Sequence, residues 1–100
     1  TYEDLGLCKY GEGGQFIEEG HPELNGKIPV NPSGGLLACG HPVGATGLMQ
    51  AAFAFWQVQG TIDKHMGSDR LQIPNAKRAL IHSHAGTGTY VAVSIMERGR

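Results

Sequence analysis

A single histidine, His41, stands between a glycine and a proline in the stretch of this 100-residue chain that is richest in small residues. Residues 31–47 read Asn-Pro-Ser-Gly-Gly-Leu-Leu-Ala-Cys-Gly-His-Pro-Val-Gly-Ala-Thr-Gly. Glycine loses the most backbone entropy on folding, so this density indicates a backbone that approaches a ligand closely or adopts positive φ. Pro42 suits the first turn of a helix. We therefore expect His41 at a strand-to-helix junction, where the positive end of the helix dipole favours the neutral imidazole that a general base requires.

This run resembles the signature of the thiolase superfamily, close to Asn-x-x-Gly-Gly-x-x-x-x-Gly-His-Pro-x-Gly-x-[Ser/Thr]-Gly, and every fixed position is met from Asn31 to Gly47. Residues 1–8 resemble the segment that follows the His-Asp-Cys-Phe loop in thiolases of the sterol-carrier type. Residues 85–93 resemble the last loop and the closing strand. Thiolase chains are much longer, so the resemblance implies that residues 1–100 are a partial domain without its N-terminal half. The implied fold is α/β, the C-terminal portion of the layered α-β-α-β-α thiolase fold.

The resemblance also implies an activity, CoA-thioester acyl transfer, with an acyl-CoA substrate and with coenzyme A as substrate and not as cofactor. His41 then activates a nucleophilic cysteine and helps to bind the thioester oxygen, since a base beside a thiol supplies the attacking thiolate. That cysteine belongs to the N-terminal half, and neither Cys8 nor Cys39 matches its position. The glycines implied in substrate binding are Gly40, Gly44 and Gly88.

Cys39 lies two residues before His41, and in an extended segment both side chains would face the same side. A Cys–His pair is therefore conceivable. Because the resemblance puts an ordinary variable residue there, we interpret Cys39 instead as a small buried hydrophobic residue.

The second implied catalytic segment is His84-Ala85-Gly86. Many thiolases carry Cys-x-Gly here, with the cysteine as acid/base and the glycine N–H as an oxyanion donor. Gly86 can keep that backbone role, and His84 replaces the cysteine, either as a proton shuttle or as a structural histidine at a turn. His41, His82 and His84 could alternatively form a zinc site. The resemblance explains His41 without a metal, so no metal is predicted.

Composition excludes several other classes of protein. Eight basic and nine acidic residues give a net charge of −1, which leaves no electrostatic footprint for nucleic acid. No apolar run approaches the ~20 residues of a membrane span, and the Gly-rich run lacks the lysine of a P-loop. Two cysteines are too few for a disulfide scaffold, so we expect a cytoplasmic protein.

The pattern of apolar residues predicts a helix from Val43 to Gln59, apolar almost all round and therefore buried, ending at Gly60. Phe53, Phe55 and Trp56 should belong to the core. Before this helix, the sequence predicts the end of a helix over residues 1–6, a short helix around Gln15–Glu19, and extended segments over Lys27–Asn31 and Gly35–Ala38. After it, the sequence predicts a polar stretch over Thr61–Asn75 and two strands, Ala79–His82 and Tyr90–Met96. The second of these strands should be a central strand of a sheet. So apolar a helix needs the missing N-terminal half or a second subunit to cover it.

Two functions remain beside thiolysis and the reverse Claisen condensation. One is a retro-aldol lyase acting on a steroid side-chain CoA ester, because members that lack the usual cysteines perform that reaction. The other is a non-catalytic protein that binds acyl-CoA or lipid.

Overall fold

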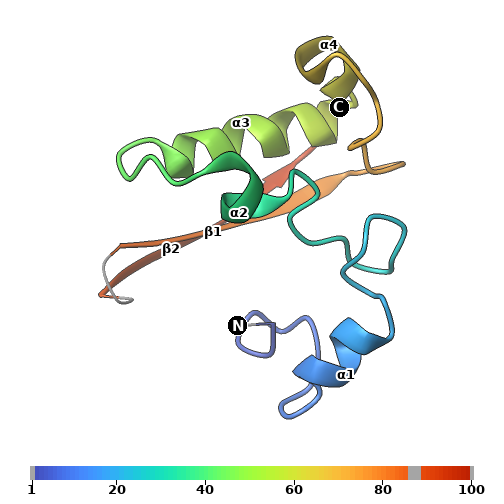
Figure 1. Ribbon diagram of the computed structural model, residues 1–100, viewed down its shortest axis with the longest axis vertical. Coiled ribbons are helices and arrows are strands. Elements are labelled where there is room, and N and C mark those ends of the chain that lie inside the picture. The colour runs from blue at the N-terminus through green and yellow to red at the C-terminus, as the bar shows by residue number, and fades with distance from the viewer. Residues whose placement is uncertain (1, 86–88, 100) are drawn as a thin grey trace. The chain divides into compact units, whose positions relative to one another are not determined.

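The structure is a computed structural model that describes residues 2–85 and 89–99, in two compact units, Thr1–Pro32 (unit 1) and Ser33–Arg100 (unit 2). Unit 1 holds one short helix, and unit 2 holds three helices and an antiparallel hairpin (Figure 1). The elements in chain order are α1 (Gly13–Glu18), α2 (Gly35–Cys39), α3 (Thr46–Gln59), α4 (Ile62–Met66), β1 (Arg78–Ala85) and β2 (Tyr90–Glu97). Within the described part of the chain, no helix is both long and apolar enough to cross a membrane.

Unit 1 is organised around Phe16, which is buried on α1 and is contacted edge-on by Tyr2 at a ring separation of 5.6 Å. The predicted helix here is confirmed, although α1 begins and ends slightly earlier. The predicted helix end over residues 1–6 is wrong for the described residues 2–6, which form a turn in which the Gly6 N–H donates to the Glu3 carbonyl. After α1 the chain folds back, with the Ile28 N–H donating to the His21 carbonyl at 2.9 Å.

Helix α3 is the main helix of unit 2, as the apolar pattern predicts. It begins at Thr46 and not at Val43, because the preceding residues form a turn closed by the Ala45 N–H on the Pro42 carbonyl. It ends at Gly60, whose left-handed φ of 74° is accessible to glycine at little cost.

The predicted strands are confirmed, and both are longer than the sequence indicated. β1 and β2 pair antiparallel, with Leu80 opposite Ile95 and His82 opposite Val93. Helix α3 packs mainly on β1, where a Cβ built on Gly47 would lie 3.8 Å from the Ser83 Oγ. Since side chains alternate along a strand, His82 and His84 belong to the other face of the hairpin.

The expectation of a helix buried on all sides is wrong for the described residues. Ala54 and Val58 are buried, whereas Leu48 is 77% exposed and the predicted core residue Phe55 is 47% exposed. On the sheet, the predicted central strand β2 pairs only with β1 among the described residues, and its Val93 is 50% exposed. Apolar side chains therefore remain on the surface of α3 and of the hairpin.

Two short helices differ from the sequence expectation. The segment predicted as extended over Gly35–Ala38 is α2, which starts after Gly34 at φ 92°. The polar stretch after Gly60 contains α4, whose Ile62 is fully buried. No strand is formed over the other predicted extended segment, Lys27–Asn31. Short helices carry too few turns for a periodic pattern to stand out.

A buried polar contact joins the end of α3 to the segment that leads into β1. Gln57, only 5% exposed, donates to the Leu71 carbonyl at 2.6 Å. Its Oε1 accepts from the Ile73 N–H at 2.9 Å and from the Gln72 amide at 3.0 Å. Both ends of the Gln57 amide are satisfied, as burial of a polar group requires.

Candidate functional site

His41 lies in the turn between α2 and α3, and its side chain is exposed. Its ring nitrogen Nδ1 is 2.7 Å from the hydroxyl oxygen of Thr46, the first residue of α3. The Thr46 hydroxyl in turn donates to the Pro42 carbonyl at 3.1 Å. One nitrogen of the ring is therefore held by the start of the helix, which leaves Nε2 for a reacting group.

The backbone around His41 explains one of the predicted glycines. Gly40 ends α2 with φ 78° and ψ 179°, a conformation that L side chains rarely adopt, and so it turns the chain toward His41 and Pro42. Gly44 has no atom within 4 Å of the position that a Cβ would take, so there is open space beside the histidine loop. The other predicted glycines, Gly86 and Gly88, lie outside the described residues.

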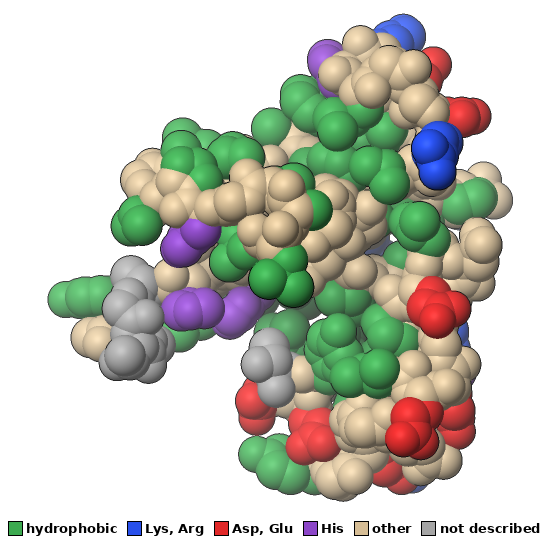
Figure 2. Space-filling view, viewed as in Figure 1, with side chains coloured by type: hydrophobic (Ala, Val, Ile, Leu, Met, Phe, Trp, Pro, Cys, Tyr) green, Lys and Arg blue, Asp and Glu red, His purple; other side chains and the backbone are tan. Residues whose placement is uncertain are grey.

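His84 is on β1, in the same unit as His41, and its ring lies 5.7 Å from that of His82 with the planes tilted by 41°. Figure 2 shows histidine side chains gathered along the hairpin and below the N-terminal end of α3. Among the described residues, no group of three or more His, Cys, Asp or Glu side chains is placed to hold a metal ion.

The two cysteines lie in different units of the chain. Cys39 ends a helix and is exposed, with its Sγ 3.6 Å from the Ser33 carbonyl oxygen that it contacts. The extended segment and the buried side chain expected there are therefore both wrong. Cys8 is in unit 1, where partial burial and then the Glu3 and Glu12 carboxylates raise the pKa of its thiol. A raised pKa reduces the thiolate fraction, so Cys8 is a poor nucleophile.

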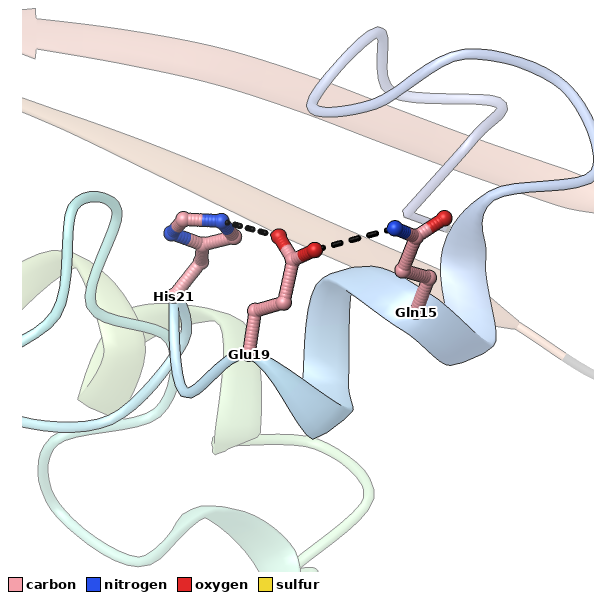
Figure 3. A network of polar contacts seen from close by, with 3 residues as sticks. All are labelled: Gln15, Glu19 and His21. Atoms are coloured by element: carbon pink, nitrogen blue, oxygen red, sulfur yellow. Dashed lines mark hydrogen bonds and ion pairs between the residues drawn. The ribbon is translucent and has the colours of Figure 1, made fainter.

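A second polar cluster, which the sequence reasoning missed, lies in unit 1 (Figure 3). The Glu19 carboxylate accepts from the Gln15 amide at 3.0 Å and contacts the His21 Nε2 at 2.8 Å. The hydrogen bond with His21 makes the largest contribution to lowering the pKa of Glu19, and the hydrogen bond with Gln15 makes the next largest. The cluster borders an open hollow of about 280 Å³, which Cys8 also lines. The available signal was the spacing of four between Gln15 and Glu19, which places both side chains on one helix face.

Thr46 is the site residue of unit 2 that the sequence reasoning missed. It occupies the Ser/Thr position of the Gly-His-Pro run, five residues after His41. Its side chain is buried, with 6% of the residue exposed. The sequence did contain a signal for the contact of Thr46 with His41. Thr46 follows Pro42 by four residues, about one helical turn, so its hydroxyl can lie close to the loop that holds His41.

Comparison with known proteins identifies the family of the chain. A family described as "Thiolase C-terminal domain-like" matches residues 1–98. The chain is 47% identical over 96 residues to an acetyl-CoA acetyltransferase of Methanothermobacter thermautotrophicus. It is 44% identical over 99 residues to sterol carrier protein 2 of Bos taurus, and 41% identical over 83 residues to non-specific lipid-transfer protein-like 2 of Caenorhabditis elegans.

The matches cover nearly all of this chain but little of each relative. The three alignments take in 96%, 99% and 83% of the chain, in the same order. They take in 24%, 17% and 19% of the relatives. The chain thus spans about a fifth of the length of these proteins.

Proposed function

The chain belongs to the thiolase family, with the family's C-terminal domain matched over residues 1–98, and from that premise we propose that it supplies the base of a CoA-thioester acyltransferase. The reaction is the thiolytic cleavage of a 3-ketoacyl-CoA or the reverse Claisen condensation. The observation that carries the proposal is the exposed His41 ring, held through Nδ1 by Thr46 inside the Gly-His-Pro loop. The names of the acetyl-CoA acetyltransferases among the relatives support the substrate class.

In this function His41 takes the proton from the thiol of a cysteine in the N-terminal half, and the resulting thiolate forms the acyl intermediate. The proposal includes residues 1–100 as a partial domain of the layered α-β-α-β-α fold. The exposed Leu48, Phe55 and Val93 support this, because further layers of the parent protein would cover them. Coenzyme A is a substrate in the proposed reaction, and no resident cofactor or metal is required.

The remaining proposed roles belong to the second catalytic segment and to the glycines. The Gly86 N–H would stabilise negative charge on the thioester oxygen, and His84 would move a proton in place of the missing cysteine. Gly40, Gly44 and Gly88 would let the backbone approach the acyl-CoA. The open space beside Gly44 supports this role for that residue.

A retro-aldol lyase acting on a steroid side-chain CoA ester is the second candidate. The observation that favours it is His84, because an acid/base cysteine would stand at this position in the cleaving and condensing thiolases. The relatives named sterol carrier protein 2 and lipid-transfer protein-like 2 are compatible with a lipid-like substrate or with a protein that only binds one.

The test uses the full-length protein that contains this chain, assayed with acetoacetyl-CoA and CoA and, separately, with a steroid side-chain CoA ester. Acetyl-CoA formation that is lost in His41→Ala and retained in His65→Ala supports the acyltransferase. His65 is the matched control, because it belongs to the same unit but lies on α4, where its ring stacks on Trp56 of α3. Turnover of the steroid ester alone would select the lyase, and binding without turnover of either ester would contradict both enzymes.

A further inference from the structure

Thr46 has a hydroxyl group with two neighbours, and this decides how it can serve the histidine. One neighbour is the His41 Nδ1 at 2.7 Å, and the other is the Pro42 carbonyl oxygen at 3.1 Å. Thr46 is buried while His41 is exposed, so the contact joins a fixed group to a ring that reaches solvent.

A hydroxyl carries a single hydrogen, so Thr46 can donate to only one of these two neighbours. Donation to the carbonyl four residues earlier is the usual local bond of a threonine in a helix. The Pro42 carbonyl also accepts the Ala45 and Thr46 N–H groups at 2.8 and 2.9 Å, so its oxygen faces three donors at the start of the helix. With the hydroxyl hydrogen on Pro42, its oxygen accepts, and the hydrogen between it and the ring belongs to His41 Nδ1.

We infer that Thr46 is a positioning residue that holds neutral His41 in the Nδ1–H tautomer, with the lone pair of Nε2 directed to the reacting group. The inference rests on the proposed function for its catalytic meaning, but the tautomer is a property of the chain itself. With the opposite tautomer Nε2 would carry a hydrogen, and the ring could not take a proton there.

The same contact serves both protonation states of the ring. When Nε2 takes a proton, both nitrogens carry hydrogens, and Nδ1–H still donates to the Thr46 oxygen. The hydroxyl therefore keeps its orientation toward Pro42 while the ring gains and loses a proton. A valine at this position would leave Nδ1–H without its acceptor, whereas a serine would keep it.

The tautomer is measured directly by ¹⁵N NMR of the histidine rings in the 100-residue chain, at a pH where His41 is neutral. Comparison with His41→Gln assigns the resonances. We expect Nδ1 of His41 to be protonated in the wild type and in Thr46→Ser. In Thr46→Val we expect Nε2 to carry the proton, which is the form that an exposed imidazole without a partner prefers. A protonated Nε2 in the wild type, or the same tautomer in Thr46→Val, would overturn the inference.

Kinetics of the full-length protein then separate positioning from packing. Thr46→Val should lower kcat about tenfold, the equivalent of one hydrogen bond, with KM changed less than about twofold. Thr46→Ser should restore kcat, and Thr61→Val, which alters a threonine just before α4, should leave it unchanged. Thr46→Ser with the slow kcat of Thr46→Val would show a packing role and overturn the inference.

The two proposals fail in different ways. If His41→Ala leaves turnover intact, the proposed function fails, although the tautomer can still be read from the spectrum. If His41→Ala abolishes turnover while Nε2 carries the proton in the neutral wild type, the base is correct and the role of Thr46 is wrong.

Discussion

Two histidines of this chain are held by a hydrogen bond, and their partners differ in kind. In unit 2 the Nδ1 of His41 contacts a hydroxyl at 2.7 Å, and in unit 1 the Nε2 of His21 contacts the Glu19 carboxylate at 2.8 Å. The Glu19 carboxylate is an acceptor with a negative charge, whereas the Thr46 hydroxyl is neutral and can accept or donate.

This difference bears on the role that we propose for His41. The carboxylate partner of His21 carries a negative charge, and its hydrogen bonds with His21 and then with Gln15 lower the pKa of Glu19. The hydroxyl partner of His41 orients the ring and adds no net charge. Of the two histidines, His41 is therefore the one to which we assign the proposed role of general base.

The largest expected effect concerns activity of the chain by itself. The 100-residue chain should not catalyse thiolysis of acetoacetyl-CoA, because a base without a nucleophile cannot carry the acyl intermediate. The measurement is acetyl-CoA formation by the purified chain. Activity that approached that of a complete enzyme and survived Cys39→Ala would show that the nucleophile had been sought in the wrong place.

Next in size is the effect of removing each histidine from the full-length protein. His41→Ala should lower kcat by about 10²–10⁴-fold, the usual contribution of a general acid or base, with a much smaller rise in KM. His21→Ala should leave kcat within about threefold, since its partner suits a structural role. Steady-state kinetics of both variants and of His84→Ala decide the matter. A His41→Ala enzyme within about threefold of wild type beside an inactive His84→Ala enzyme would transfer the role of base to His84.

The comparison of the two units extends to association. Unit 2 exposes Leu48 by 77% and Ile95 by 70%, so the chain should form dimers or larger species at micromolar concentration. Leu48→Lys or Ile95→Lys should weaken this association, whereas Ile17→Lys in unit 1 should leave it unchanged. Sedimentation equilibrium measures the mass. A compact monomer near 10.6 kDa with a cooperative thermal transition would show a self-sufficient domain.

The smallest expected effect is the pH dependence of unit 1. Because the pKa of Glu19 is lowered in the folded chain, its contribution to stability is complete above the unfolded value of about 4.3. That contribution is lost as the pH falls through the lower folded value. Glu19→Gln should therefore lower the melting temperature slightly at neutral pH, with the deficit vanishing as the pH falls through the lowered pKa of Glu19. Glu18→Gln is the control, and an equal deficit in both variants would contradict the role of the Glu19–His21 pair.

The sequence predicted those features that rest on long patterns. The run from Asn31 to Gly47 indicated the family, and the apolar stretch ending at Gly60 located α3. Alternation of apolar residues located β2, and β1 was predicted as the strand that precedes it. Phe55 was predicted in the core but is exposed. The cause is physical, because the apolar pattern shows which side chains favour burial and does not show whether this chain contains the residues that would bury them.

Contacts between distant residues were beyond the sequence. The predicted extended conformation before Cys39 failed because two glycines at positive φ start a short helix there. For the candidate site, the sequence singled out His41 and Gly40, and the roles assigned to them stay predictions. The hydroxyl contact of Thr46 depends on the turn at Pro42, which places the first residue of α3 beside the ring.

The buried Gln57 amide has a consequence for the segment that follows it in the chain. Its bonds to Leu71 and Ile73 bring together the two ends of the stretch that contains α4, so that this stretch is a closed loop on the fold. The Ile73 amide belongs to no helix or strand, yet it should exchange its hydrogen with solvent as slowly as the amides of the hairpin. Residues inserted at the exposed Ser68 would lengthen the loop at small entropic cost and leave the start of β1 where it is. Natural variation in length should therefore accumulate at this loop tip, and a domain or label could be inserted there without moving the histidines.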